Sequence, residues 1–381
     1  MGIKNRRKRK LKIAMVVERF PPDLGGSGIR FSKIAERLSH RHEIDIITLG
    51  SPNIQDLMCT FNIHRFDADK LPVLTYHRIN RVIGHSFSTF FQLLFRSYDV
   101  IDVDIWPLVP FFSTKIAQAN TRTIVSWNVA WPLSFNKNIN RISNLLARII
   151  STLSTDNITV SDFARESLVK YLRMSPGKIK VIPNGIDTSF TKAKLKPKWG
   201  RLIFVGRFEP QKRLDLLLEA FKIVRKRIND IELHIIGGGP LRQQMMIASR
   251  NLSGLYVHDP IPADRRDELA YELSRSWVFA SASEFETYGL SIAESMSLGL
   301  PVILTRTPYN AAINEFVKHG HNGLIVEHNQ PRAIADAIER LYRDQQLWKK
   351  LSSNAKCSTL FHSWDEIANE VETVYQKSGR R

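Results

Sequence analysis

The sequence has little cysteine and no long apolar segment. Only two cysteines occur in 381 residues, Cys59 and Cys357, and they are far apart in the chain. Two such cysteines exclude a disulfide scaffold and a cysteine metal site, and they are typical of a reducing cytoplasm. No apolar stretch approaches the roughly 20 residues that cross a bilayer, and no signal-peptide segment precedes the first predicted strand. We therefore expect a cytoplasmic protein.

Acidic residues are scarce beside basic ones, and the net charge is +18. An anionic phospholipid surface, a nucleic acid or a phosphate-bearing substrate would each explain this excess, as would a solubilising surplus with no partner. No zinc-ligand set, RNP-like aromatic pattern or recognition module is present, so we expect no nucleic-acid partner. The excess is densest near the N-terminus, where no acid occurs among seven basic residues: Lys4, Arg6, Arg7, Lys8, Arg9, Lys10 and Lys12.

Short apolar strands alternate with helical patterns along the whole chain. This alternation predicts an α/β fold with two doubly wound, Rossmann-like parallel sheets facing a central cleft, and ligands in such folds bind at the carboxyl ends of the strands. The predicted strands are 12–17, 43–49, 100–103, 123–126, 157–160, 178–182, 201–206, 231–236, 255–258, 277–280, 301–304 and 323–326. The predicted divisions are a basic tail over 1–11, an N-terminal domain over 12–187, a linker over 188–200, a C-terminal domain over 201–360 and a C-terminal segment over 361–381.

Two cations lie at the top of a predicted strand and before the following helix. Gly206 and Arg207 end the strand, and Lys212 precedes the helix that begins near Leu214. An arginine, a lysine and a helix N-terminus at one place can hold an anion, which a diphosphate leaving group requires as its charge grows. A solvated basic loop is the alternative interpretation.

Two carboxylates follow a later strand, eight residues apart. Glu286 lies in a predicted loop and Glu294 about one turn into a helix, with Gly289 between them where the helix opens. Carboxylates in these places can accept hydrogen bonds from sugar hydroxyls. The alternative is two surface glutamates, but Glu294 stands among apolar residues, where an unpartnered carboxylate is unfavourable.

Glycine-rich turns follow two other strands. Gly237, Gly238 and Gly239 precede Pro240, and Gly25–Gly28 follows the first strand. Glycines permit tight turns and allow a ligand to approach backbone amides. The first loop lacks GxGxxG spacing and a clear ribose-binding acid, so NAD is not expected. No metal-ligand spacing appears, and we expect neither a metal nor a cofactor.

Taken together and in this order, these motifs resemble glycosyltransferase family 4, a retaining family with the GT-B fold. The resemblance covers residues 11 to about 375 and implies a nucleotide-diphosphate sugar as donor substrate. It also implies that the domain over 12–187 is the acceptor side, that the domain over 201–360 binds the nucleotide-sugar, and that a helix over 361–381 crosses back to the N-terminal domain. The matching segments are Gly25-Gly26, Ile182–Asp187, Gly206-Arg207 with Lys212, Gly237–Pro240, Glu286–Glu294, Gly299–Val302, Asn322–Val326 and Ser363–Ala368.

The resemblance implies a role for each matching residue. Arg207 and Lys212 would bind the donor diphosphate, Glu286 the donor sugar, and Glu294 the ribose; Glu286, Arg207 and Lys212 would be the catalytic residues. Gly26 would bring backbone amides near the phosphates or the acceptor. The remaining donor-binding positions implied in this way are Gly206, Gly238, Gly239, Tyr288, Gly289 and Leu290.

The N-terminal half departs from the family pattern at three positions. Asn128 stands where many relatives carry a histidine, and Asp102 and Asp104 stand where relatives often show His-x-His. Asparagine can hydrogen-bond a hydroxyl but cannot gain a proton. We expect these residues to line the acceptor side; caps and turns at a strand end are the alternative for the two aspartates.

A helical segment in the same half has an apolar face flanked by Arg78, Arg81 and Arg96. Core packing would explain this face, as would contact with an anionic membrane. With the basic tail, it suggests peripheral attachment at the cytoplasmic face of a membrane. The residues of the apolar face are Phe87, Phe90, Phe91 and Leu94.

The leading hypothesis is thus a hexosyltransferase that extends a lipid-linked glycan, a polysaccharide or a glycoconjugate. A non-catalytic nucleotide- or carbohydrate-binding relative is the second hypothesis, and a basic nucleic-acid-binding protein is the third. The donor-side residues favour the first.

Overall fold

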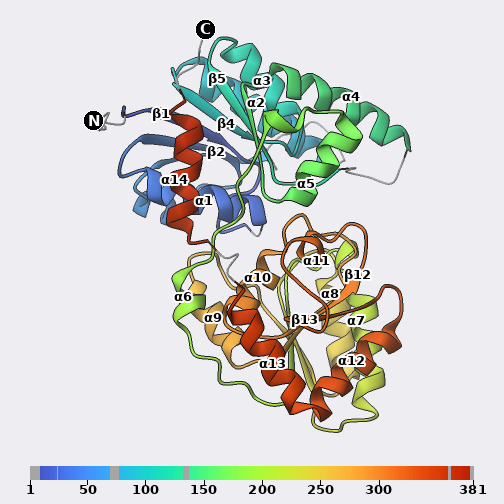
Figure 1. The fold of residues 1–381 in the computed structure, drawn as a ribbon. Helices are drawn as coiled ribbons and strands as arrows, with labels where there is room; N and C mark the ends of the chain where they lie inside the picture. The colour runs from blue at the N-terminus through green and yellow to red at the C-terminus, as the bar shows by residue number, and fades with distance from the viewer. Residues whose placement is uncertain (1–8, 24, 69–76, 132–136, 359–361, 378–381) are drawn as a thin grey trace, which may run out of the picture. The chain divides into compact units, whose positions relative to one another are not determined.

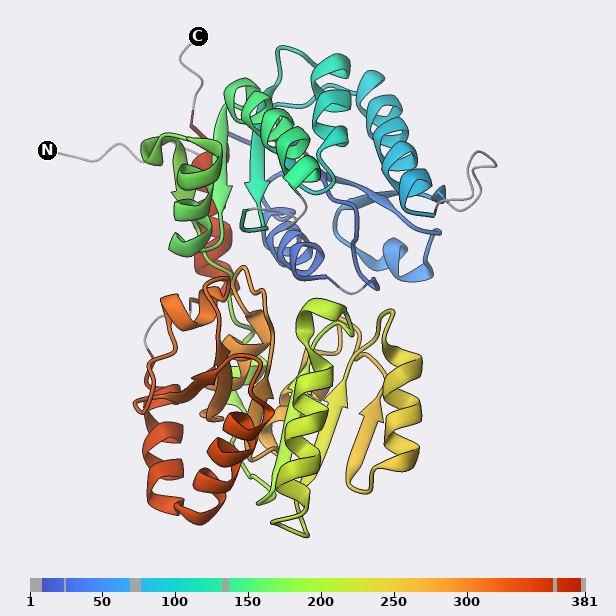
Figure 2. The same cartoon turned by 90° about the vertical axis from the view of Figure 1, so that its right-hand side faces the viewer.

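The computed structural model describes residues 9–23, 25–68, 77–131, 137–358 and 362–377 (Figure 1). The chain forms two compact units, residues 1–183 with 364–381 (unit 1) and residues 184–363 (unit 2). Each unit has a parallel sheet with helices on its two faces, as Figures 1 and 2 show. The predicted doubly wound fold is therefore confirmed.

The sheet of unit 1 has seven strands in the order β3-β2-β1-β4-β5-β6-β7, and each neighbouring pair is parallel. Four of the five residues of β1 are fully buried, as expected of a central strand covered on both faces. The strands are β1 Lys12–Val16, β2 Glu43–Leu49, β3 Asn62–Phe66, β4 Val100–Asp104, β5 Arg122–Trp127, β6 Asp156–Thr159 and β7 Ile179–Val181.

Strand β3 was not predicted from the sequence. It lies at the edge of the sheet, and none of its five residues is fully buried. Its sequence, NIHRF, has no continuous apolar run, because an edge strand need not be buried on both faces. Its pairing with β2 is what orders it as a strand.

The helices of unit 1 cover its sheet in two groups. Phe31 of α1 and Trp364 of α14 pack in the core on one face, while Leu93 of α2, Phe111 of α3 and Ile150 of α4 pack on the other. The helical segments are α1 Gly26–Leu38, η1 Ile54–Met58, α2 His77–Leu94, α3 Val109–Ala117, α4 Lys137–Leu153, α5 Asp162–Ser167, η3 Leu168–Leu172, η4 Pro176–Lys178 and α14 Trp364–Tyr375.

Polar contacts also hold the last helix, α14, in unit 1. The hydroxyl of Tyr375 donates to Asp102 Oδ2 at 2.5 Å, and Glu372 lies 3.1 Å from the buried ring of His42. Arg122 donates to the backbone carbonyls of Val374 and Tyr375, which belong to the open C-terminal end of the helix. This C-terminal segment is thus part of the core of unit 1.

Unit 2 has a six-stranded parallel sheet in the order β10-β9-β8-β11-β12-β13. Its strands are β8 Arg201–Val205, β9 Glu232–Ile236, β10 Leu255–His258, β11 Val278–Ser281, β12 Val302–Arg306 and β13 Gly323–Glu327. Its helical segments are α6 Thr188–Lys192, η5 Pro210–Lys212, α7 Leu214–Arg225, α8 Arg242–Asn251, α9 Arg266–Ser274, α10 Leu290–Ser297, α11 Ala311–Glu315, α12 Pro331–Arg343 and α13 Gln345–Lys356.

Residues 188–200, which the sequence suggests as a linker, lie within unit 2 instead. Phe190 in α6 is fully buried, and the ring of Trp199 packs 5.1 Å from that of Trp277. The change of unit occurs after Pro183. The polar, aperiodic composition of this segment does not show that two of its aromatic side chains pack in the fold, because the residues that they contact are remote in sequence.

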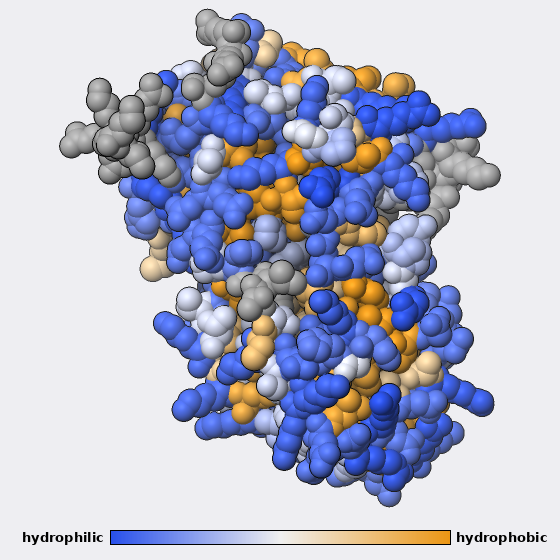
Figure 3. Space-filling model, in the orientation of Figure 1, coloured by the Kyte–Doolittle hydropathy of each residue, from blue (hydrophilic) through white to orange (hydrophobic). Residues whose placement is uncertain are grey.

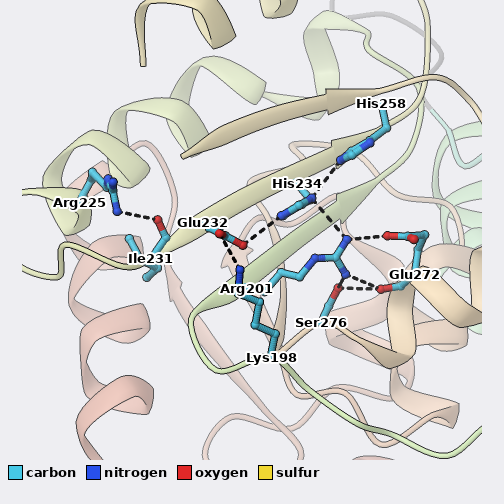
Figure 4. Close-up of polar contacts among 9 residues, drawn as sticks. All are labelled: Lys198, Arg201, Arg225, Ile231, Glu232, His234, His258, Glu272 and Ser276. Atoms are coloured by element: carbon cyan, nitrogen blue, oxygen red, sulfur yellow. Dashed lines mark hydrogen bonds and ion pairs between the residues drawn. The ribbon is translucent and has the colours of Figure 1, made fainter. Parts of the chain in front are cut away.

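A polar network binds α9 to the sheet of unit 2 (Figure 4). Arg201, the first residue of β8, donates to Glu272 Oε2 at 2.5 Å and to Ser276 Oγ at 2.9 Å. The same guanidinium lies 3.3 Å from the ring of His234, which lies 2.9 Å from that of His258. Burial, followed by the charge of Arg201, lowers the pKa of His234 to about 4, so this ring is neutral near pH 7. The network fixes the C-terminal half of α9.

Candidate active site

Lys212 and Glu286, two of the predicted catalytic residues, are in direct contact. Lys212 ends the short helix η5 that follows β8, and Glu286 lies in the loop that follows β11. The Lys212 ammonium donates to Glu286 Oε1 at 2.6 Å, and both side chains are only partly exposed. Since β8 and β11 are neighbouring parallel strands, their carboxyl ends bring the two loops together. The pair unites the predicted phosphate-binding cation and the predicted sugar-binding carboxylate.

The Glu286 loop is held by the loop that follows β12. The Glu286 amide donates to the carbonyl of Tyr309 at 2.9 Å, and the Ala311 amide donates to the carbonyl of Glu286 at 2.8 Å. These two backbone bonds fix the main chain on either side of the carboxylate. A sugar-binding group must be held in this way if its hydrogen bonds are to be directed.

Arg207 lies at the same edge of the sheet, immediately after β8. Its guanidinium forms an ion pair with Glu209, and its side chain is 29% exposed. The group is therefore accessible to an anion. Arg213, which follows Lys212, has a left-handed backbone with φ 48° and pairs with Asp215 at 3.0 Å.

The glycines after β8 and β9 allow two loops to pack closely. A Cβ at Gly237 would lie 1.9 Å from the carbonyl oxygen of Gly206, and one at Gly239 would lie 2.8 Å from that of Phe208. The amide of Phe208 donates to the carbonyl of Gly238 at 2.8 Å. Gly237 and Gly239 are thus required by loop packing alone, whereas contact of Gly206, Gly238 and Gly239 with a donor stays a prediction.

The segment from Tyr288 to Leu290 opens helix α10. Gly289 has φ 85° and precedes Leu290, the first residue of the helix; a Cβ there would lie 3.0 Å from the side chain of Ile292. The hydroxyl of buried Tyr288 donates to the carbonyl of Asn184 at 3.2 Å. This tyrosine therefore ties the Glu286 loop to the first residues of unit 2.

Glu294 is the fifth residue of α10 and is only 3% exposed. Its Oε1 accepts a hydrogen bond from Arg266, the first residue of α9. The prediction that a buried carboxylate in this place needs a partner is met by Arg266, which was not predicted from the sequence. An arginine in the polar run ADRRDE has no pattern that distinguishes it from a surface charge.

The acceptor-side residues predicted in unit 1 meet at the carboxyl edge of its sheet. Asn128 donates to Asp104 Oδ1 at 3.0 Å, and Ser27, in the first turn of α1, also hydrogen-bonds Asp104. Burial raises the pKa of Asp104 to about 7. Gly26 is exposed as the first residue of α1, with open space where a Cβ would be.

Asp102 has a different environment from Asp104. It is 2% exposed and accepts hydrogen bonds from Ser126 Oγ at 2.8 Å and from Tyr375. Burial raises its pKa to about 6. Both oxygens have partners inside unit 1, so Asp102 connects β4, β5 and α14. The role of Tyr375 has no sequence signal, because its partner is 273 residues away.

No group of three or more His, Cys, Asp or Glu that could hold a metal ion occurs in the part of the chain that the structure describes. The arrangement at the edge of unit 2 instead offers cations for a phosphate, carboxylates for hydroxyls, and close-packed glycine loops. This set of groups suits a phosphorylated, hydroxyl-rich ligand.

Comparisons with known proteins agree with this chemistry. The model of the glycosyl transferases group 1 family matches residues 186–357, and that of glycosyltransferase family 4 matches residues 24–190. The chain is 24% identical to the N-acetyl-alpha-D-glucosaminyl L-malate synthase of Bacillus anthracis, over 96% of this chain and 97% of that protein. It is 28% identical to an uncharacterised glycosyltransferase of Methanocaldococcus jannaschii, over 60% of this chain and 61% of that protein.

A solved structure shares the fold across both units. The Anabaena protein HepE, in complex with UDP and glucose, aligns with a TM-score of 0.71 and 16% identity over 96% of this chain and all of that chain. Its fold is GT-B, with two Rossmann-like domains. The two family models together span residues 24–357 and name the same chemistry. The chain is therefore a glycosyltransferase of family 4 with the GT-B fold, an enzyme that transfers sugar from a nucleotide sugar.

Proposed function

We propose that this enzyme transfers a hexosyl group from a nucleotide-diphosphate sugar to a lipid-linked glycan, with retention of the anomeric configuration. The observation that carries the donor half is the contact between Lys212 and Glu286. A phosphate-binding cation and a sugar-binding carboxylate must be neighbours, because the bond that breaks joins the sugar to the phosphate.

The cations would act on the leaving group. As the bond between the sugar C1 and the diphosphate oxygen breaks, its electron pair stays on the diphosphate. Arg207 and Lys212 stabilise that growing charge, and a preorganised cation does so without reorganisation at the moment of reaction. Gly206, Gly238 and Gly239 allow the diphosphate to approach the backbone at the same edge.

The carboxylates would hold the hydroxyls of the donor. Glu286 accepts hydrogen bonds from the sugar, and Glu294 from the ribose. The Glu286 loop lies beside the phosphate cations, while Glu294 lies one turn into α10. Tyr288, Gly289 and Leu290 carry the chain between them and shape the site around the donor.

Retention would follow from attack on the face that the leaving group departs from. The acceptor hydroxyl oxygen bonds to C1, and its proton passes to the departing phosphate oxygen, so no protein base is required. This route fits Asn128, which has no titratable group. The transfer balances without a metal or a redox cofactor.

The donor site is tested by a thermal-shift screen with UDP-, GDP-, ADP- and dTDP-sugars, starting with UDP-glucose. A ligand at 100 times its Kd stabilises the folded protein by about 2.7 kcal/mol. We expect one nucleotide class to raise Tm and Arg207→Ala to abolish the shift. Arg343→Ala, which removes an exposed arginine paired within its own helix, is the matched control. A shift that survives Arg207→Ala, or no shift with any donor, contradicts the assignment.

For the acceptor, we propose Asp104 and Asn128 as the hydrogen-bonding pair. They lie at the carboxyl edge of unit 1, next to the exposed Gly26. Asp102 was predicted beside them, but both of its oxygens accept hydrogen bonds, one from Ser126 and one from Tyr375. We therefore propose that Asp102 has a structural role and does not contact the acceptor.

A membrane partner is proposed from the outer surface of three helices of unit 1. Helices α2, α3 and α4 contain no aspartate or glutamate but carry Arg81, Lys115, Arg141 and Arg148, of which Arg81 pairs with Glu18 at 2.9 Å. The side chain of Arg78, predicted to flank the apolar face, lies outside the described residues. Apolar side chains gather along the upper edge of unit 1 in the view of Figure 3. The exposed large apolar residues of this outer helix face are Ile83, Phe87, Phe91, Leu94, Val109, Ile116, Ile142, Leu145, Ile149 and Leu153.

The spacing of these residues supports an interfacial role over core packing. Ile142, Leu145, Ile149 and Leu153 recur at helical spacing on α4, and Ile142 is 66% exposed. Large exposed apolar patches mark interaction sites, and cations with no acids select an anionic lipid surface. Among the described residues, the structure has no helix with the length and hydropathy of a membrane span. We therefore propose peripheral attachment at the cytoplasmic face of a membrane.

Flotation with vesicles tests this attachment. We expect the protein to float with phosphatidylglycerol-containing vesicles at low salt but not with pure phosphatidylcholine, and to lose flotation in Leu145→Ser/Ile149→Ser. The matched control, Ile247→Ser/Tyr271→Ser, removes exposed apolar residues of unit 2. Deletion of residues 1–8 measures the contribution of the first part of the basic tail, with Lys4, Arg6, Arg7 and Lys8. Binding that the α4 variant leaves unchanged excludes this face, and no binding to anionic vesicles excludes the membrane partner.

A further inference from the structure

Arg266 is a buried cation in an unfavourable place. It is the first residue of helix α9, and its side chain is only 10% exposed. The N-terminus of a helix carries a partial positive charge, which repels a cation, and burial removes the hydration of the guanidinium. The preceding residue, Arg265, has a side chain that is 60% exposed and pairs with Glu268 in the same helix. Of these two neighbouring arginines, only Arg266 is buried, so its partners must compensate for its burial.

Three groups from two other segments surround this guanidinium. Glu294 of α10 accepts from its Nη2, Asp187 Oδ2 lies 3.5 Å from its Nε, and the ring of Phe190 lies 4.9 Å from its central carbon. Two carboxylates and an aromatic face thus compensate for one cation. Through Arg266, the first residues of unit 2 and helix α9 are connected to Glu294.

We propose that Arg266 is a positioning residue for recognition of the nucleotide ribose, acting through Glu294. The inference rests on the proposed function, in which Glu294 accepts hydrogen bonds from the ribose hydroxyls. A carboxylate can accept about four hydrogen bonds, so one bond from Arg266 does not by itself saturate Glu294. Arg266 fixes the direction in which the oxygens of this buried carboxylate point.

The site then has two carboxylates, each held by its own cation. Lys212 holds Glu286 at 2.6 Å, and Arg266 holds Glu294. Because α9 is fixed at its other end by the contact between Arg201 and Glu272, Arg266 is supported by a rigid element. Ribose binding and sugar binding are therefore separable by mutation, since each depends on a different ion pair.

The test compares nucleoside diphosphates with and without the ribose 2′-hydroxyl. Affinities of UDP, GDP and ADP and of their 2′-deoxy forms are measured by calorimetry for the full-length protein. We expect wild type to bind one ribonucleotide at least about tenfold more tightly than its deoxy form, because hydrogen bonds to charged groups have this strength. In Arg266→Met, affinity for the ribonucleotide falls by about tenfold and the preference over the deoxy form disappears. Arg266→Lys restores part of the preference, and Arg265→Met retains all of it.

A second variant separates positioning from folding. Arg266→Met leaves Glu294 buried without its cation, so its Tm falls, whereas Arg266→Met/Glu294→Gln removes both charges and regains stability. The double variant also lacks the proposed ribose-binding carboxylate, so its ribose preference tests the role of Glu294, while Arg266→Met and Arg266→Lys, with Glu294 intact, test positioning by Arg266. A preference that persists in Arg266→Met overturns the inference and leaves the donor site standing, and one that persists in the double variant overturns the ribose role of Glu294. Absence of nucleotide binding by wild type overturns the proposed function and the inference together, and binding without ribose preference overturns the roles of Glu294 and Arg266.

Discussion

Glu286→Gln is expected to lower kcat by about 10²–10³-fold, the range seen when one preorganised polar contact to a transition state is removed. Glutamine retains the shape and can still accept a hydrogen bond, but it loses the charge and the ion pair with Lys212 at 2.6 Å. Because Glu286 is proposed to touch the sugar and not the nucleotide, binding of the free nucleoside diphosphate changes little. Single-turnover kinetics and calorimetry with the nucleotide and the nucleotide-sugar measure the two effects separately.

The matched control is Glu284→Gln, which removes a carboxylate from the same loop. The backbone of Glu284 bonds Gln211 and Thr307, and these bonds are unchanged by the substitution. We expect near-wild-type turnover in this variant. Unchanged kcat in Glu286→Gln would remove Glu286 from the reaction and reduce its contact with Lys212 to a structural ion pair.

Lys212→Met is the second large effect, with an expected loss in kcat of about 10²-fold or more, because a leaving-group cation is removed from a partly buried site. In contrast to Glu286→Gln, this variant also weakens binding of the free nucleoside diphosphate, since Lys212 is proposed to contact phosphate. The control is Lys222→Met on the exposed surface of α7, where the same chemical change removes a solvated lysine. Normal nucleotide affinity in Lys212→Met would contradict the phosphate role.

The double variant Lys212→Met/Glu286→Gln tests whether the two residues act together. Substitutions of residues in direct contact have non-additive effects on free energy, whereas the fold-losses in kcat from independent substitutions multiply. We expect the double variant to be far less impaired than the product of the single losses. If the two fold-losses in kcat multiply, the contact between Lys212 and Glu286 at 2.6 Å has no part in the reaction.

The parallel sheets were predictable because their strands are short, apolar and separated by helical periods. β1 and β8 were recognised within one residue, since strands buried on both faces carry their own signal. β3 was not recognised, because its pattern at an edge is set by its neighbour β2. The segment 188–200 was assigned to a linker because local composition does not show that Phe190 and Trp199 are anchored.

The candidate site was predictable from the sequence where the proposed function calls for particular residue types near strand ends. Arg207, Lys212, Glu286 and Glu294 were proposed on this ground, because a phosphate needs cations and hydroxyls need acceptors. Arg266 does not, since an arginine beside Arg265 in a polar run is indistinguishable from a surface charge. Only its burial and its contact with Glu294 reveal it.

The sequence by itself determined the α/β architecture and the residue types at the strand ends of unit 2, because hydrophobic periodicity and strand-end motifs are local. Tertiary structure alone decided which of those residues meet. It placed Lys212 on Glu286, 74 positions away, and Arg266 on Glu294. It also divided the acidic pair of β4, joining Asp102 to Tyr375 and Asp104 to Asn128. The physical reason is that parallel strands bring loops that are remote in sequence to the same edge of the sheet. What a charged side chain does there depends on the residue that it contacts.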